Sequence, residues 1–278
     1  MTPELAAKYE ALKAVFADMG SALVAFSGGV DSALALKAAH DALGDKAVAA
    51  TGLSATYAEE EMVEAKAIAA EIGAAHIVVT TMELDDPRYA NNTHQRCFFC
   101  KTELYSKLRE VATKQGYAVV VDGSNADDAG DFRPGMRAAK QLEVRSPLLE
   151  LGWHKDEIRE VAQALGIRIW NKPAAACLSS RFAYGDPITI EKLRQVAAAE
   201  KAVRALGFRG FRVRHHDNVA RLEIPSAQIA QALELSEEIV QGVKSAGYSY
   251  VALDLEGYRA GSQNEVLDAR LQPGGLRR

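Results

Sequence analysis

The sequence predicts an α/β protein: a doubly wound parallel sheet, followed by a smaller α+β domain at the carboxyl end. Two observations carry this prediction. In the first half, four short apolar runs typical of buried strands alternate with segments of helical periodicity. In the second half this alternation stops, and shorter strand-like runs follow one long amphipathic helix. Helices must then cover both faces of the first sheet, and ligands are expected at the carboxyl ends of its strands.

Each element of the first half has its own signal. The run Ser21–Phe26 is apolar and leads into a glycine turn, and the helical pattern after this turn stops at Gly44. Later strands are expected at residues 46–53, 75–80 and 117–123, and later helices at residues 57–73, 100–116 and 154–166. Strand and helix thus alternate as parallel sheets require.

The second half predicts a smaller domain with an antiparallel sheet. Helices are expected at residues 189–207 and 228–247, and strands at residues 211–216, 219–225 and 248–259. The junction between the two halves contains Pro173, Gly185 and Pro187, residue types that interrupt helices and strands. We therefore expect domains at residues 1–170 and 171–268, with a disordered tail at 269–278.

Composition excludes several classes of protein. The chain has 278 residues, is 48% hydrophobic and carries a formal net charge of −4 at pH 7. This composition suits a globular protein with a sizeable core and argues against a chain-wide nucleic-acid surface. No basic leader begins the sequence, and no run reaches about 18 consecutive apolar residues. We expect a cytoplasmic protein, in which three cysteines do not form a disulfide framework.

The strongest local motif is AFSGGVDS at Ala25–Ser32, where a predicted strand ends and a helix begins. Gly28 and Gly29 allow the backbone to approach a phosphate, and a helix N-terminus favours negative charge. Ser27 and Ser32 add hydroxyl donors. The motif lacks the Gly-Lys-Ser/Thr ending of a Walker A loop, and an ordinary glycine turn is the alternative interpretation.

This motif resembles the PP-loop of the ATP pyrophosphatases, the family of GMP synthetase, NAD synthetase, argininosuccinate synthetase and the tRNA thiolases. The resemblance implies that ATP is cleaved between its α and β phosphates, that an acceptor oxygen is adenylylated, and that pyrophosphate is released. It makes Ser27, Gly28, Gly29, Asp31 and Ser32 the expected ATP-binding residues, with Asp31 also catalytic.

Acidic residues crowd the loop after the fourth predicted strand. This loop contains Asp122, Asn125, Asp127, Asp128 and Asp131. Carboxylates gathered at the carboxyl edge of a sheet repel one another unless they are solvated or hold a cation such as Mg²⁺. A solvated turn is the usual explanation for such a loop alone, but beside a PP-loop a magnesium site for ATP is favoured.

The acidic loop continues into DFRPGMRAA, and the whole segment Val120–Gly152 resembles the LarE proteins, the sulfur-insertase branch of the PP-loop family. That family adenylylates a carboxylate of pyridinium-3,5-biscarboxylate mononucleotide and replaces its oxygen with sulfur, twice per cofactor. The product is the nickel-pincer nucleotide used by lactate racemase. By this resemblance, which covers nearly the whole chain, Asp122, Asn125, Asp128 and Arg133 also bind ATP.

The resemblance extends into the second half. The segment NKPAAACLSSRFAYGDPIT is similar to the central cysteine segment of the family, which places Cys177 at the sulfur-handling position with Ser180 and Arg181 beside it. Cys177 and Arg181 are therefore expected to be catalytic.

Four further residues match family positions that surround a bound phosphate or metal: Glu200, Arg212, Arg214 and Glu223. Arg212 and Arg214 alternate along a predicted strand, so both guanidinium groups lie on one face, as a clamp for the substrate phosphate requires. Glu200 and Glu223 are candidates for a divalent metal or the same phosphate. A solvated strand face is the alternative for the two arginines.

The cysteines allow several interpretations. Cys97 and Cys100 form a C-x-x-C pair, which alone could be a redox dithiol, half of a zinc site, or packed thiols. Three thiolates, with Cys177, suit three irons of a [4Fe–4S] cluster and leave the fourth iron open to sulfide. Family members with only the central cysteine are thought to give up its own sulfur, so a sacrificial Cys177 is the rival hypothesis.

Three functions remain in view: the nickel-pincer sulfur transferase, a tRNA thiolase, and a non-catalytic adenine-nucleotide sensor. We favour the first, because a tRNA enzyme needs a basic surface and this chain is acidic. The expected partners are ATP with Mg²⁺, the pyridinium mononucleotide and sulfide or another sulfur donor. We expect a homo-oligomer that contacts neither membrane nor nucleic acid.

Overall fold

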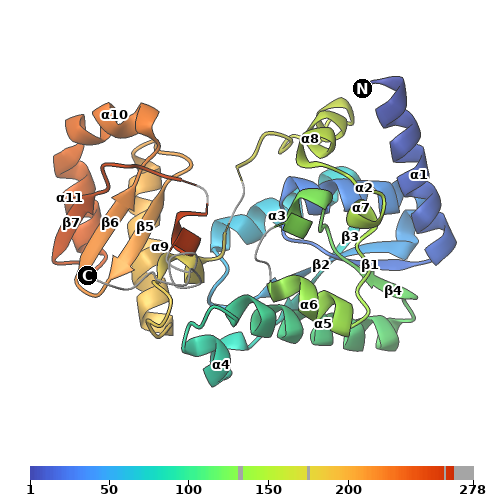
Figure 1. The fold of residues 1–278 in the computed structure, drawn as a ribbon, viewed down its shortest axis with the longest axis horizontal. Helices are drawn as coiled ribbons and strands as arrows, with labels where there is room; N and C mark the ends of the chain where they lie inside the picture. The colour runs from blue at the N-terminus through green and yellow to red at the C-terminus, as the bar shows by residue number, and fades with distance from the viewer. Residues whose placement is uncertain (131–133, 174–175, 260, 266–278) are drawn as a thin grey trace, which may run out of the picture. The chain divides into compact units, whose positions relative to one another are not determined.

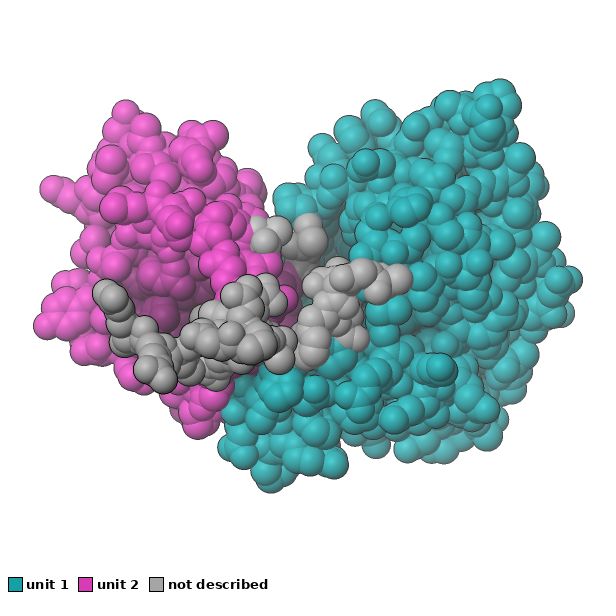
Figure 2. All heavy atoms as spheres, viewed as in Figure 1, with its two compact units in different colours: residues 1–175 teal, residues 176–278 magenta. Residues whose placement is uncertain are grey.

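The computed structural model describes residues 1–130, 134–173, 176–259 and 261–265. The chain forms two compact units, Met1–Ala175 and Ala176–Arg278, which Figure 2 shows in teal and magenta. The expected tail at residues 269–278 lies outside the described residues. Each unit has its own hydrophobic core.

The first unit alternates strands and helices as predicted. Its strands are β1 (Ala22–Ala25), β2 (Ala47–Leu53), β3 (Ala75–Thr80) and β4 (Val119–Val121). Its helices are α1 (Pro3–Met19), α2 (Val30–Leu43), α3 (Glu59–Ile72), α4 (Pro87–Ala90), α5 (Arg96–Gln115), α6 (Pro134–Gln141), α7 (Pro147–Glu150) and α8 (Lys155–Ala164). The helix expected from residue 100 begins four residues earlier, so both cysteines of the C-x-x-C pair lie on α5.

The four strands form a parallel sheet in the order β3-β2-β1-β4. The chain runs outward from β1 through β2 to β3, then returns through α5 to place β4 on the other side of β1 (Figure 1). The strand order therefore reverses between β1 and β4. In such sheets the loops after the two strands that flank the reversal form the ligand crevice.

Alternate strand residues bury against two separate helical layers, because successive side chains of a strand point to opposite faces. Ala22 and Val24 pack with α1, α2 and α8, whereas Leu23 and Ala25 pack with α5 and α6 (Figure 1). All four of these strand residues are buried, as the uninterrupted apolar runs predict for a doubly covered parallel sheet.

The second unit is a smaller α+β structure. Its helices are α9 (Ile190–Ala205), α10 (Ile229–Glu234) and α11 (Ser236–Ser245), and its strands are β5 (Arg212–His216), β6 (Val219–Glu223) and β7 (Tyr250–Leu253). β5 and β6 form the expected antiparallel hairpin, with Asp217 at positive φ in its turn. Leu222, Val203 and Val243 are among the buried residues that join sheet and helices in one core.

Two predictions for this unit were wrong. The sheet is mixed, not antiparallel, because β7 pairs in parallel with β6. The helices between these strands act as a crossover connection, which returns the chain to the starting end of β6 and so forces the parallel direction. The single helix expected at residues 228–247 is divided at Leu235 into α10 and α11. Among the described residues, no helix combines the length and apolarity needed to cross a membrane.

Candidate active site

The glycine turn after β1 forms a pre-shaped cradle for an anion. Gly28 has φ +71°, a conformation that few side chains tolerate, and a β-carbon there would lie 3.1 Å from the side chain of Ala65. Ser32 Oγ donates to the Gly29 carbonyl at 3.0 Å and lies 3.2 Å from Ser27 Oγ. Gly29 is the N-cap of α2 and has no side chain, so no side-chain hydrogen bond caps the first turn of this helix.

Asp31 lies in the first turn of α2, and its two carboxylate oxygens have different surroundings. Oδ2 forms an ion pair with Lys155 Nζ, a residue in the first turn of α8. Oδ1 is buried and has no hydrogen-bond partner among the described residues. A carboxylate with one buried, unsatisfied oxygen is suited to complete the coordination of a cation, because oxygen ligands are those that Mg²⁺ prefers.

The loop after β4 approaches the cradle closely. A β-carbon on Gly123 would lie 2.7 Å from the Ser32 backbone nitrogen and 2.9 Å from its α-carbon. Only glycine therefore allows the loop to pack on the first turn of α2. This contact brings together the two segments that the sequence analysis selected, at the reversal of strand order.

The acidic residues of this loop have protein partners. Asp122 accepts hydrogen bonds from Tyr105 Oη at 2.8 Å and Ser146 Oγ at 2.7 Å, and Asp128 Oδ2 accepts from the Asn125 amide at 3.1 Å. Asp122, Asn125 and Asp128, which the sequence predicts to bind ATP, are all buried. Their first role is thus to shape the loop, and their binding of ATP or Mg²⁺ stays a prediction. Asp131 and Arg133 lie outside the described residues.

Asp127 links the same loop to α8. Its Oδ1 lies 2.7 Å from His154 Nδ1, and its Oδ2 accepts the Lys155 backbone amide at 2.7 Å. The hydrogen bond with His154, followed by that with the Lys155 amide, lowers the pKa of Asp127 below its usual value. The loop carboxylate therefore stays ionised and fixes the start of α8.

Cys97 and Cys100 lie three residues apart near the start of α5, which places their side chains on neighbouring positions of one helical turn. Cys97 is exposed and Cys100 is partly exposed, and neither is in a disulfide. Phe98 and Phe99 stand between them in sequence, and Arg137 and Arg88 stack over these two rings at 5.0 and 4.7 Å. The turn thus presents two soft sulfur donors beside cationic groups.

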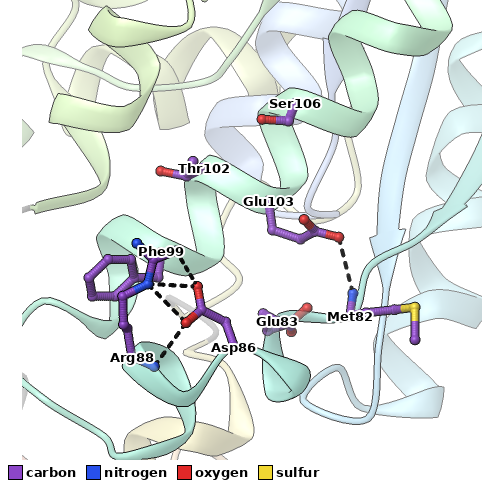
Figure 3. A pocket seen from close by; sticks show the side chains of 8 residues that line it. All are labelled: Met82, Glu83, Asp86, Arg88, Phe99, Thr102, Glu103 and Ser106. Atoms are coloured by element: carbon purple, nitrogen blue, oxygen red, sulfur yellow. Dashed lines mark hydrogen bonds and ion pairs between the residues drawn. The ribbon is translucent and has the colours of Figure 1, made fainter.

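A small pocket lies on the adjacent face of α5 (Figure 3). It is lined by Met82, Glu83, Asp86, Arg88, Phe99, Thr102, Glu103 and Ser106. Asp86 and Arg88 pair with each other at 2.8 Å, and Glu103 Oε1 accepts the Met82 amide at 3.4 Å. The sequence did not predict a site role for any of these lining residues. Within the described ranges, no three His, Cys, Asp or Glu side chains are grouped to hold a metal.

Cys177 is the second residue of the second unit and is exposed, as is Ala176 before it. Arg181 fixes the backbone of this segment, because its Nη1 donates to the carbonyls of Ala176 at 2.6 Å and Cys177 at 3.0 Å. The remaining donors of Arg181 bind Glu200 in a bidentate pair, Nε to Oε1 at 2.7 Å and Nη2 to Oε2 at 2.9 Å. Glu200 thus positions Arg181, and Arg181 fixes the backbone of the cysteine segment.

Arg212 and Arg214 lie on β5 in the same neighbourhood. Arg214 Nη1 donates to the Ser180 carbonyl at 2.6 Å, and its Nη2 pairs with Glu223 Oε2 at 2.7 Å. The Arg212 guanidinium stacks on Tyr258 at 4.9 Å. Burial, and next the nearby charge of Arg181, lower the pKa of Arg212. Arg181 and Arg214 thus bind the Cys177 segment, and Arg212 adds a third positive charge near Arg181, a grouping that suits a phosphate.

Sequence reasoning missed two residues at the cradle. From sequence, Lys155 is only part of a predicted helix, and Tyr57, whose Oη donates to the Ser27 carbonyl at 2.9 Å, is only the start of another. A lysine at the start of a helix after the fourth strand was the only available signal for the first. Nothing local distinguishes Tyr57, because its partner comes from a different loop.

Comparisons with known proteins agree with this geometry. A family model described as NAD synthase matches residues 8–120. The pyridinium-3,5-bisthiocarboxylic acid mononucleotide synthase of Lactiplantibacillus plantarum is 41% identical over 265 residues, which cover 95% of this chain and 96% of that protein. The chain belongs to the LarE family. An uncharacterised Synechocystis protein is 48% identical over 265 residues, covering 95% of this chain and 99% of the relative.

Membership in the LarE family confirms the predicted PP-loop fold and an enzyme that uses ATP in sulfur transfer. A more distant similarity involves part of the chain: one subunit of the glutamine-hydrolysing GMP synthase of Methanococcus maripaludis is 33% identical over 164 residues, 52% of this chain and 50% of that protein. The LarE match, by contrast, extends through both compact units and includes the second-unit residues described above.

Proposed function

We propose that the protein adenylylates the carboxylates of pyridinium-3,5-biscarboxylic acid mononucleotide, releases pyrophosphate, and inserts sulfur to form the bisthiocarboxylic acid mononucleotide of the nickel-pincer cofactor of lactate racemase. The observation that carries this proposal is the glycine cradle before α2, packed against the loop after β4 at the reversal of strand order. The relative with 41% identity is named as the synthase of that product.

In the proposed reaction the first unit binds ATP. The uncapped amides of α2 and the Ser27 and Ser32 hydroxyls hold phosphate oxygens, and the buried Oδ1 of Asp31 binds Mg²⁺. Asp122, Asn125, Asp128 and Arg133 complete the nucleotide site.

The second unit, with the junction beginning at about residue 171, handles substrate and sulfur in this proposal. Arg212 and Arg214 bind the mononucleotide phosphate, and Arg181 keeps Cys177 in place. Glu200 and Glu223 were predicted as metal or phosphate ligands; their pairing with Arg181 and Arg214 supports instead a role in positioning these arginines. Removing Arg214 should weaken substrate binding about ten- to a hundredfold, because a charge-assisted hydrogen bond is lost, and leave ATP binding unchanged.

For sulfur delivery we propose a [4Fe–4S] cluster bound by Cys97, Cys100 and Cys177, which supplies an open iron for sulfide when bound. Cys97 and Cys100 fit this group, since they are accessible thiols on one helical turn and soft ligands that iron–sulfur clusters prefer. The donor is sulfide or another small sulfur carrier, and the protein acts in the cytoplasm as a homo-oligomer without nucleic acid.

Adenylylation is tested by supplying ATP, Mg²⁺ and the pyridinium mononucleotide and measuring AMP and pyrophosphate. Asp31→Ala should abolish pyrophosphate formation without unfolding the protein. Asp41→Ala is a matched control, because Asp41 lies on the same helix, pairs with Lys37 and is 26% exposed against 22% for Asp31. Production of ADP and phosphate by the unmodified protein would contradict the proposal.

The cysteines are tested separately with anaerobically reconstituted protein. Each single Cys→Ser variant should lose the broad visible absorption of the cluster and sulfur transfer together, while adenylylation persists. The rival hypothesis predicts one sulfur per chain and conversion of Cys177 to dehydroalanine, seen by mass spectrometry as loss of H₂S. That mass change, with Cys97→Ser and Cys100→Ser still active, would exclude the cluster.

A further inference from the structure

Lys155 has no role in the function proposed above, yet its ammonium group lies at the phosphate cradle. It is the first residue of α8, and its Nζ forms an ion pair with Oδ2 of Asp31, the second residue of α2. The two residues are separated by 124 positions in the sequence. The fold therefore brings a lysine to the helix N-terminus where an anion would sit.

Two carboxylates, Asp127 and Glu157, fix the backbone from which the Lys155 side chain extends. Asp127 Oδ2 accepts the Lys155 amide at 2.7 Å, and Asp127 Oδ1 contacts His154 Nδ1 at 2.7 Å. Glu157 accepts the His154 amide at 2.7 Å and is itself paired with Lys8 at 2.7 Å. The start of α8 is thus fixed, and the lysine is placed in advance of any ligand.

Fold stability does not account for this pair. Both side chains are partly exposed, 32% for Lys155 and 22% for Asp31, and ion pairs of this kind contribute little to stability. The same aspartate keeps its other oxygen buried and without a partner in the described part of the chain, which is unfavourable. Such an arrangement is understandable if Lys155 and Asp31 exchange partners when a ligand binds.

We propose that Lys155 contacts the β- and γ-phosphates of ATP and stabilises pyrophosphate as it leaves, an inference that rests on the adenylylation proposed above. In that step a substrate carboxylate oxygen bonds to the α-phosphorus while the bond from this phosphorus to the bridging oxygen breaks. The electron pair of the broken bond stays on pyrophosphate. The Lys155 ammonium group faces the charge that develops there, as fixed cations do in phosphoryl and nucleotidyl transfer.

The test is calorimetric binding of three ligands in the presence of Mg²⁺: ATP, inorganic pyrophosphate and AMP. Lys155→Met should weaken ATP and pyrophosphate about ten- to a hundredfold, because one charge-assisted contact is lost, and leave AMP unchanged. Lys155→Arg, which keeps the charge, should recover most of the affinity. Lys37→Met is the matched control, since Lys37 is a partly exposed lysine paired with Asp41 further along α2, and it should alter none of the three affinities.

Equal losses for AMP and ATP in Lys155→Met, or unchanged pyrophosphate affinity, would overturn the inference. If the unmodified protein binds neither ATP nor pyrophosphate, the proposed function itself fails, which is a distinguishable result. Should Lys155→Met not fold, an amine-reactive label on the unmodified protein replaces it. Pyrophosphate should then protect Lys155 from modification whereas AMP should not, and equal labelling in both would count against the role.

Discussion

Replacing Glu200 by glutamine removes one charge from a buried pair without changing the size of the side chain. The Glu200 and Arg181 side chains are 4% and 6% exposed, and two hydrogen bonds of 2.7 and 2.9 Å join them. Glu200 Oε1 also accepts the Val213 backbone amide of β5 at 3.1 Å. The carboxylate therefore connects α9, β5 and the cysteine segment.

The magnitude follows from the charge that remains. Glutamine keeps one acceptor oxygen but leaves the Arg181 guanidinium buried without an anion, and breaking a buried pair in this way costs about 3–5 kcal/mol. At about 1.4 kcal/mol per factor of ten, the folding equilibrium of the second unit should fall roughly a hundred- to several-thousandfold.

Chemical denaturation, followed by fluorescence and by a probe on the second unit, measures this change. Glu256→Gln is the control, because Glu256 is 71% exposed in its pair with Arg259. The same substitution there should change the free energy of unfolding by less than about 1 kcal/mol.

A Glu200→Gln protein of normal stability that has lost metal or substrate binding would refute this reasoning and restore the ligand role predicted from sequence. The double variant Arg181→Met/Glu200→Leu gives a second check. It should recover much of the stability, because a buried pair replaced by apolar groups leaves no unpaired charge. It should not recover sulfur transfer, since the carbonyls of Ala176 and Cys177 lose their donor.

Two further predictions concern the loop after β4 and the second core. Gly123→Ala should weaken ATP binding and cost about 1–3 kcal/mol, because its β-carbon meets the Ser32 backbone; Gly242→Ala, whose β-carbon would lie 2.9 Å from Ala202, should affect stability alone. Burial lowers the pKa of His215 below its usual 6.5. The unfolded chain then binds a proton at higher pH than the folded one, so this histidine contributes stability above pH 6.5 that is lost as the pH falls toward its folded pKa. His215→Gln should reduce the slope of unfolding free energy against pH, measured by denaturation at several pH values. An unchanged slope would show that another group causes this pH dependence.

Local sequence was sufficient for the framework of the first unit. β3 lies at Ala75–Thr80 as predicted, and the glycine cradle stands between β1 and α2 as the motif required. These features depend on neighbouring residues: apolar runs select buried strands, and paired glycines allow the tight turn. Lys155, Tyr57 and the Arg181–Glu200 pair were not predictable in this way, because each depends on a partner from another segment.

The sequence by itself determined the fold class, the position of the glycine cradle, the cysteine pattern and the family, since all four depend on residue type and spacing along the chain. Only the tertiary structure decided how the charged residues are used. Asp122 is satisfied by Tyr105 and Ser146, Glu200 by Arg181, and β7 joins its sheet in parallel. The physical reason is that a carboxylate has the same appearance in sequence whether it will bind a cation, a hydroxyl or an arginine, and folding alone selects the partner.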